Sequence, residues 1–175
     1  MAARLPSLSI PFDDTNSSSS ATTNQSEVAS TQGIINIIGA ILIANTCHRV
    51  CTCCINEYLK DDAILYEMVS TKIIDEVKKN GLNKGIILSG LEWSEQPNDL
   101  LDIVLVALNR DLKIMVYTYL EENEFTDLFP ILVKYPIFIK FGAYLPDLSC
   151  DSYFSYGVKL ATTNQHIKYF GDINS

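Results

Sequence analysis

Basic residues are scarce in this chain of 175 residues. Only 13 Lys and Arg side chains stand against 21 Asp and Glu, which gives a formal net charge of -8 at pH 7. A nucleic-acid-binding protein needs a basic surface to neutralise phosphates, and anionic membranes attract basic surfaces too. The composition therefore argues against nucleic acid and against a membrane as partners.

Long apolar runs are also lacking. The apolar stretch Ile34 to Ala44 is interrupted by Asn36 and is much shorter than the ~20 residues that span a bilayer. It has neither the basic flank nor the N-terminal position of a secretory signal. We therefore expect a cytoplasmic protein.

The beginning of the chain has few large apolar side chains. The segment from Asp13 to Gln32 is rich in Ser, Thr and Asn, and Ser17 to Ser20 are consecutive serines. Such a segment cannot bury enough surface to offset the entropy of ordering. We expect a disordered tail over residues 1–32 and one domain over residues 33–175, because the chain is 47% hydrophobic and long enough to bury a core.

Cysteine, by contrast, is concentrated in one place. Three cysteines, Cys47, Cys51 and Cys54, follow the apolar stretch with the spacing CxxxCxxC. Cysteines in one tight loop can hardly pair without strain, and Cys150 would leave several thiols unpaired, so a metal explains them better. Three thiolates can hold a 4Fe-4S cluster whose fourth iron stays open to a chelating substrate. Zinc in a closed site with His48 is the alternative.

Strands and helices alternate along the rest of the chain. Apolar periodicity predicts strands at 34–44, 84–89, 112–118 and 137–141, a helix from Asp61 or Asp62 to just before Gly81, a helix at 97–109, and a short helical or irregular segment at 125–134. This alternation is typical of a mostly parallel α/β sheet with helices outside. Four or so βα units cannot close an eight-stranded barrel, so we expect an open, partial (βα) barrel.

Ligand sites in parallel sheets gather at the carboxyl ends of the strands. The residues that follow the four predicted strands there are Cys47; Ser89, Gly90, Leu91 and Glu92; Thr118; and Gly142. The sequence therefore predicts one site at this edge of the sheet.

The order of these motifs resembles the small activating enzymes of anaerobic (class III) ribonucleotide reductases, within the radical S-adenosylmethionine (SAM) superfamily. The similar segments are Cys54-Ile55-Asn56-Glu57 at the end of the cysteine loop, the segment 85–92 (similar to GIxLSGGE), Val116-Tyr117-Thr118 (VYTGY), the segment 138–144 (FLKxGKY) and the segment 160–165 (LASSNQ). These five collinear segments lie between Ile37 and Asp172, which is most of the predicted domain.

The resemblance implies a fold and a chemistry. The fold would be the partial barrel of the radical SAM type. Cys47, Cys51 and Cys54 would bind a 4Fe-4S cluster, and the amino and carboxylate groups of SAM would chelate its fourth iron. The residues assigned to SAM binding are Ser89, Gly90, Glu92, Thr118 and Asn164, with Glu92 accepting a hydrogen bond from the SAM ammonium. Reductive cleavage of SAM would release a 5'-deoxyadenosyl radical, which would take a hydrogen atom from a glycine.

The implied partners are the large glycyl-radical subunit of an anaerobic ribonucleotide reductase and a flavodoxin- or ferredoxin-type electron donor. Two positions depart from the family pattern: Leu91 stands where a glycine precedes the acid, and Tyr119 stands where a glycine follows Thr118. A Cβ at Leu91 adds bulk to a backbone that would approach SAM closely. The alternative is therefore a degenerate radical SAM-fold protein that binds a metal cluster or zinc, and a partner protein, without cleaving SAM.

Overall fold

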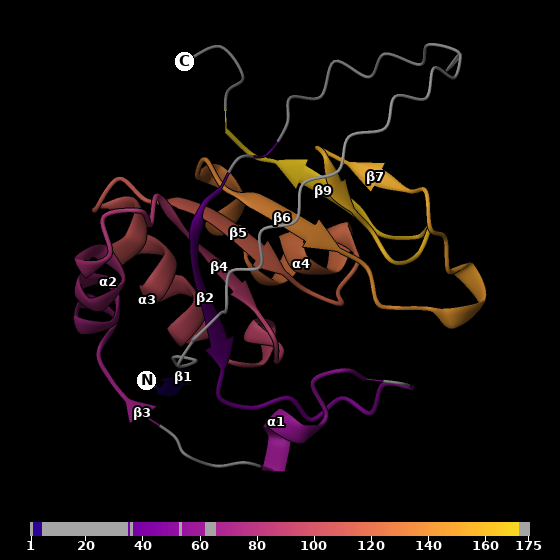
Figure 1. The fold of residues 1–175 in the computed structure, drawn as a ribbon, viewed down its shortest axis with the longest axis horizontal. Coiled ribbons are helices and arrows are strands. Elements are labelled where there is room, and N and C mark those ends of the chain that lie inside the picture. The colour runs from indigo at the N-terminus through magenta and orange to yellow at the C-terminus, as the bar shows by residue number, and fades with distance from the viewer. Residues whose placement is uncertain (1, 5–34, 36, 53, 62–65, 172–175) are drawn as a thin grey trace, which may run out of the picture.

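The computed structural model describes residues 2–4, 35, 37–52, 54–61 and 66–171. Its main element is a seven-stranded sheet with the strand order β3-β1-β2-β4-β5-β6-β9 (Figure 1). The strands of this sheet are β1 (Ala2–Arg4), β2 (Gly39–Ala44), β3 (Tyr66–Glu67), β4 (Gly85–Ser89), β5 (Lys113–Tyr117), β6 (Phe138–Phe141) and β9 (His166–Tyr169).

The middle of the sheet is parallel, as the sequence predicts. The neighbours β2 and β4, β4 and β5, and β5 and β6 all pair in parallel. The added strands β1, β3 and β9 pair antiparallel. The protein is thus a mixed α/β structure in which the carboxyl ends of β2, β4, β5 and β6 meet at one edge, which we call the carboxyl edge.

The helices are α1 (Tyr58–Asp61), α2 (Ser70–Lys79), α3 (Pro97–Leu108) and α4 (Glu122–Leu128), with short 3-10 turns η1 (Trp93–Glu95), η2 (Leu132–Lys134) and η3 (Pro146–Leu148). Figure 1 shows α2 and α3 together on one side of the sheet, and α1 beyond the arrowhead of β2. Pro97 begins α3, and its lack of an N–H costs nothing there, because the first N–H groups of a helix have no intrahelical partner.

One predicted helix begins later than expected. The sequence predicts its start at Asp61 or Asp62, but α1 ends at Asp61, β3 intervenes, and α2 begins at Ser70. Ser70 is buried and its hydroxyl donates a hydrogen bond to Asp102 on α3, which fixes the start of α2 against its neighbour. The prediction was wrong here because apolar residues upstream of Ser70 continue the helical spacing. Of the predicted strand 34–44, residues 34 and 36 lie outside the described residues, and β2 covers Gly39–Ala44.

The main core lies between the sheet and these helices. Its fully buried side chains include Leu42 on β2, Ile74 on α2, Leu88 on β4 and Ile103 on α3. The single tryptophan, Trp93, is also fully buried, and its indole N–H donates to the carbonyl of Leu42 at 3.1 Å. This bond ties the turn after β4 to the neighbouring strand.

The opposite face of the sheet carries a smaller apolar cluster. Met115 on β5 and Ile167 on β9 are buried there, together with Leu160 next to the hairpin of β7 (Phe154–Ser155) and β8 (Val158–Lys159). Tyr156 of this hairpin contacts the ring of Phe138 edge-on, with ring centroids 5.8 Å apart. The hairpin and β9 were not predicted from the sequence; β9 adds an edge strand next to β6, and the hairpin packs against the face opposite α2 and α3.

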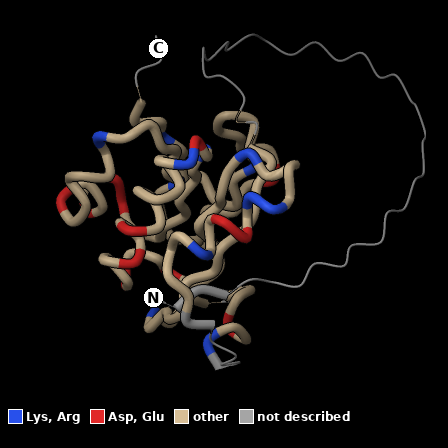
Figure 2. The backbone as a smooth tube through the Cα atoms, turned by 90° about the vertical axis from the view of Figure 1, so that its left-hand side faces the viewer, with Lys and Arg blue, Asp and Glu red and all other residues tan. Residues whose placement is uncertain are grey.

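The predicted tail falls largely outside the described residues. Within it the structure describes only Ala2–Arg4, which form β1 next to β2. Figure 2 shows both acidic and basic positions distributed over the described chain. Within the described ranges, no helix is both long and apolar enough to cross a membrane.

Candidate functional site

The three cysteines expected to hold a cluster share one loop between β2 and α1, beyond the carboxyl edge. Cys47, Cys51 and Cys54 are half-buried and their thiols are free of disulfides. Cys53 lies outside the described residues. Among the residues that are described, no three His, Cys, Asp or Glu side chains are gathered closely enough to hold a metal ion. The expected ligands therefore lie on one loop without converging on one point.

Polar contacts attach this loop to the turn after β4. Asn56 donates from Nδ2 to the carbonyl oxygen of Gly90 at 2.9 Å. On the other side of the loop, Glu95 Oε2 accepts the backbone N–H of His48 at 2.8 Å and lies 2.9 Å from His48 Nδ1. The loop is thus held at both ends to the segment Gly90 to Glu95, as the predicted convergence at the carboxyl edge requires.

A cation that sequence reasoning missed, Lys60, braces the same loop. Lys60 on α1 donates from Nζ to the carbonyl of Arg49 at 2.5 Å and pairs with Glu57 at 2.8 Å. The pKa of Lys60 is raised, first by its hydrogen bond to Glu57, and the charges of Cys47 and Cys54 add to this rise. Lys60 therefore lies near two of the three candidate ligands, Cys47 and Cys54.

Cys47 contacts the turn after β4 most directly. Burial raises the pKa of its thiol, and the backbone amide of Arg49 opposes that rise. The carboxylate of Glu95 raises the pKa further, while the backbone amide of Glu92 lowers it. Cys47 and Glu92 are 45 positions apart in the sequence, so this contact shows that the cysteine loop folds back onto the predicted ligand-binding turn.

Gly90 is the residue that gives this turn its shape. Its φ is +91°, in the left-handed region that side chains disfavour. A Cβ atom there would lie 2.9 Å from Cγ2 of Ile43 on β2. The neighbouring Leu91 has no positive φ and its side chain is buried in the main core. Glycine is thus required by the backbone at position 90 and not at position 91.

Glu92 joins the ends of β4 and β5. Its carboxylate is 6% exposed and accepts hydrogen bonds from Ser94 N at 3.0 Å, from Thr118 Oγ1 at 3.0 Å and from Tyr119 N at 3.1 Å. A carboxylate has about four lone-pair positions, so these bonds leave roughly one for a ligand. The structure therefore brings Glu92 and Thr118 together, as expected, and also gives Glu92 a role in holding the edge.

Lys140 is a buried cation at the same edge, and sequence reasoning did not select it. It is 8% exposed, and its Nζ donates to the carbonyl of Gly142 at 2.6 Å. Burial lowers its pKa to about 8, against the opposing charges of Glu92 and Glu121. Over the described residues no carboxylate forms an ion pair with it. The sequence does contain a sign of this burial, because Lys140 is the one charged residue in the apolar segment Phe138 to Phe141.

Strand register places Lys140 in a polar row. Lys140 on β6 pairs with Tyr117 on β5. On the other side of β5, Leu88 pairs with Val116, so the next residue of β4, Ser89, is the neighbour of Tyr117. Alternation along strands puts these three side chains on the face opposite the main helices. Burial raises the pKa of the Tyr117 phenol, so it stays a neutral hydrogen-bonding group. The row extends the predicted site across three strands.

Asn164 reaches the carboxyl edge from the segment before β9. Its Nδ2 donates to the carbonyl of Ala143 at 3.0 Å, and the neighbouring Gln165 donates to the carbonyl of Gly142 at 3.3 Å. These amides tie the last segment back to the end of β6. The Oδ1 atom of Asn164 is buried and has no hydrogen-bond partner among the described residues. One acceptor therefore remains available beside the row.

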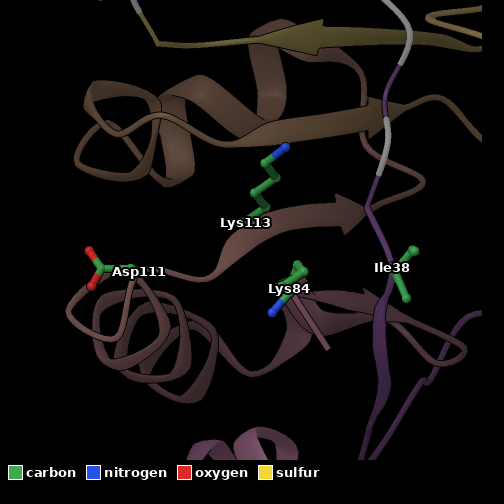
Figure 3. A pocket seen from close by; sticks show the side chains of 4 residues that line it. All are labelled: Ile38, Lys84, Asp111 and Lys113. Carbon is green, nitrogen blue, oxygen red and sulfur yellow. The ribbon is translucent and has the colours of Figure 1, made fainter. Parts of the chain in front are cut away.

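Two open hollows lie away from the cysteine loop. One, of about 400 Å³, lies at the opposite edge of the sheet. Lys84, just before β4, and Lys113, the first residue of β5, line it together with Ile38 and Asp111 (Figure 3). Another of about 300 Å³ lies around Cys150 and Lys159. The candidate site thus rests on the chemistry of its side chains and not on an enclosed volume.

Comparison with known proteins adds no relative. No family model matches this chain, and no curated protein or solved structure matches it.

Proposed function

We propose that this protein is an iron-sulfur radical SAM enzyme that activates a glycyl-radical enzyme, the large subunit of an anaerobic ribonucleotide reductase. The observation that carries the proposal is the direct contact between the cysteine loop and the turn after β4. Asn56 binds the carbonyl of Gly90, and the amide of Glu92 acts on Cys47. A thiol-rich loop and a glycine-acid turn at the carboxyl edge of a parallel sheet are the parts that such a site needs.

The donor set fits a 4Fe-4S cluster in residue type and spacing. Three thiols on one loop leave one iron without a protein ligand, and Lys60 lies beside two of them. Because the thiols do not converge as described, the proposal requires the loop to tighten when metal binds, which is the usual coupling between metal binding and folding. The anchors at Asn56 and Glu95 involve no cysteine, so they can persist during this change.

The remaining residues would bind and orient SAM. A bound cluster would supply the electron that cleaves SAM into methionine and a 5'-deoxyadenosyl radical. The free lone pair of Glu92 would accept from the SAM ammonium, and Lys140 would face an anionic group of the ligand. Ser89, Tyr117 and Asn164 Oδ1 add neutral hydrogen-bonding groups. The burial of Glu92 and Lys140 supports a site that excludes water, which a reactive alkyl radical requires.

The finer architecture belongs to the same proposal. The parallel strands β2, β4, β5 and β6 would form the open, partial barrel of the radical SAM type, with its uncovered side facing the partner. The large glycyl-radical subunit would present its glycine there. An electron donor of the flavodoxin or ferredoxin type would approach the exposed cysteine loop. We further propose that the protein acts in the cytoplasm.

Anaerobic reconstitution tests the cluster. The full chain should take up about four iron atoms, and Cys47→Ala, Cys51→Ala and Cys54→Ala should each abolish uptake. Cys150→Ala is the matched control, because this thiol lies outside the loop, and it should keep full iron content. If Cys53→Ala loses its iron and one of the other three variants keeps it, the ligand assignment is wrong.

Product analysis tests the reaction. The reduced, iron-loaded protein should convert SAM to 5'-deoxyadenosine, and Glu92→Gln should keep its iron while cleaving SAM more slowly. A protein that binds iron but yields no 5'-deoxyadenosine with SAM would contradict the enzyme assignment.

A second function is favoured by the hydrogen bonding of Glu92. Its carboxylate is largely occupied by protein donors, which leaves little capacity for a SAM ammonium. This suits a degenerate radical SAM-fold protein that binds a metal cluster or zinc and a partner protein. It would bind metal through the cysteine loop and yield no 5'-deoxyadenosine.

A further inference from the structure

One side chain of the cysteine loop stacks on a ring at the end of β5. The guanidinium carbon of Arg49 lies 3.8 Å from the centroid of the Tyr119 ring. Arg49 stands between Cys47 and Cys51, and Tyr119 is the second residue beyond β5. Both side chains are half-buried. A guanidinium over an aromatic face at this distance is a cation–π contact with planar stacking, which a lysine does not reproduce.

Tyr119 also holds the candidate acid. Its backbone N–H donates to Glu92 Oε2 at 3.1 Å, while its ring carries Arg49. The backbone of Arg49 is fixed in turn, because its carbonyl accepts from Lys60 Nζ. A continuous series of contacts therefore runs from the cysteine loop through Arg49 and Tyr119 to the carboxylate of Glu92.

We propose that Arg49 and Tyr119 form a positioning pair that sets the place of the cysteine loop relative to Glu92. Asn56 attaches one end of the loop to Gly90 and Glu95 holds His48 at the other, so the pair supplies a third point of attachment between them. Position 119 is one of the two that depart from the resembling family, whose pattern has a glycine there. The ring is thus a feature of this chain and not part of that pattern.

The first test uses the full chain without metal and does not depend on the proposed function. We expect Tyr119→Leu and Arg49→Met each to raise the rate at which iodoacetamide modifies Cys51 and Cys54 by about two- to fivefold, which is what a partly exposed cation–π contact contributes. Tyr119→Phe keeps the ring face and should keep the wild-type rate. Cys150 in the same chain is the internal reference.

A matched control comes from a second cation–π contact far from the loop. Lys168 Nζ lies 5.1 Å from the ring centroid of Phe170, so Phe170→Leu removes a comparable ring elsewhere and should leave the rates at Cys51 and Cys54 unchanged. The double variant with Arg49→Met and Tyr119→Leu should react no faster than either single variant. If the double variant instead shows the product of the two single rate increases, Arg49 and Tyr119 act independently and the pair is refuted. A Tyr119→Phe protein that is modified as fast as Tyr119→Leu would refute it too.

The second test rests on the proposed function and measures binding in the iron-loaded protein. Arg49→Met and Tyr119→Leu should keep the wild-type iron content and bind S-adenosylhomocysteine about two- to fivefold more weakly, as judged by equilibrium dialysis. Equal affinity in wild type and variants would overturn the positioning role. A wild-type protein that binds iron but no S-adenosylhomocysteine would instead count against the proposed function, and the pair would then be judged on the thiol rates alone.

Discussion

Lys140→Met should alter the pH dependence of stability in a defined way. Lys140 is 8% exposed, and burial lowers its pKa from 10.5 to about 8. Methionine has a similar length and no charge, so the variant fills the same space without the ammonium. The substitution also removes the hydrogen bond to the carbonyl of Gly142.

The sign follows from proton binding in the folded and unfolded chains. The fall in pKa from 10.5 to about 8 corresponds to about 3 kcal/mol that disfavours the folded state while Lys140 is protonated in both. This penalty is fully present below pH 8. Between about pH 8 and pH 10.5 the unfolded chain keeps the proton and the folded chain loses it, so the free energy of unfolding rises with pH. Lys140→Met should lack this rise.

Urea unfolding at pH 7.5 and pH 10 measures the effect, with the fluorescence of the single, fully buried Trp93 as the signal. The free energy of unfolding of wild type relative to Lys140→Met should increase by about 2 kcal/mol between these pH values. Tyr117 and Cys47 have raised pKa values and titrate at high pH in both proteins, so their effects cancel in the difference. A difference that stays constant with pH would refute the assignment of Lys140 as a buried, unpaired cation.

Three further substitutions test the turn after β4. Gly90→Ala should lower the free energy of unfolding by about 1–3 kcal/mol, because φ is +91° and the new Cβ would lie 2.9 Å from Ile43; wild-type stability would contradict this geometry. Leu91→Gly should cost about 3 kcal/mol by emptying a buried site, as measured by urea unfolding; a neutral effect would mean that the side chain is not in the core. Thr118→Val should cost about 1–3 kcal/mol, because the buried carboxylate of Glu92 loses a donor; a shift in thermal midpoint no larger than that of an exposed substitution would exclude this bond.

The elements that the sequence predicted well have local signals. Apolar alternation placed β4, β5 and β6 within one residue of their observed ends, and Pro97 marked the start of α3. The beginning of α2 was missed because it is fixed by the contact between Ser70 and Asp102, which are 32 positions apart. The hairpin of β7 and β8 has only two residues in each strand, too few for alternation to show.

The candidate site was predictable in its parts and not in its connections. The cysteine spacing and the position of Glu92 after a strand are visible in the sequence. Glu92 forms hydrogen bonds with Thr118 and Tyr119 because β4 and β5 pair in parallel. This pairing brings together residues that are 26 and 27 positions apart in the sequence. The burial of Lys140 depends in the same way on its neighbours β5 and β9.

Leu91 and Tyr119, which differ from the pattern of the family that the sequence resembles, can be understood from the packing around them. Leu91 directs its side chain into the main core, and the left-handed backbone of the turn is confined to Gly90, so a Cβ at position 91 does not obstruct the carboxyl edge. Tyr119 gives its ring to Arg49 and its amide to Glu92. A glycine at position 119 would keep the amide hydrogen bond to Glu92 and lose the ring that contacts Arg49 of the cysteine loop. Where the resembled pattern has two flexible glycines, this chain therefore has two packed side chains: Leu91 precedes Glu92 in the sequence, and Tyr119 contacts it from β5.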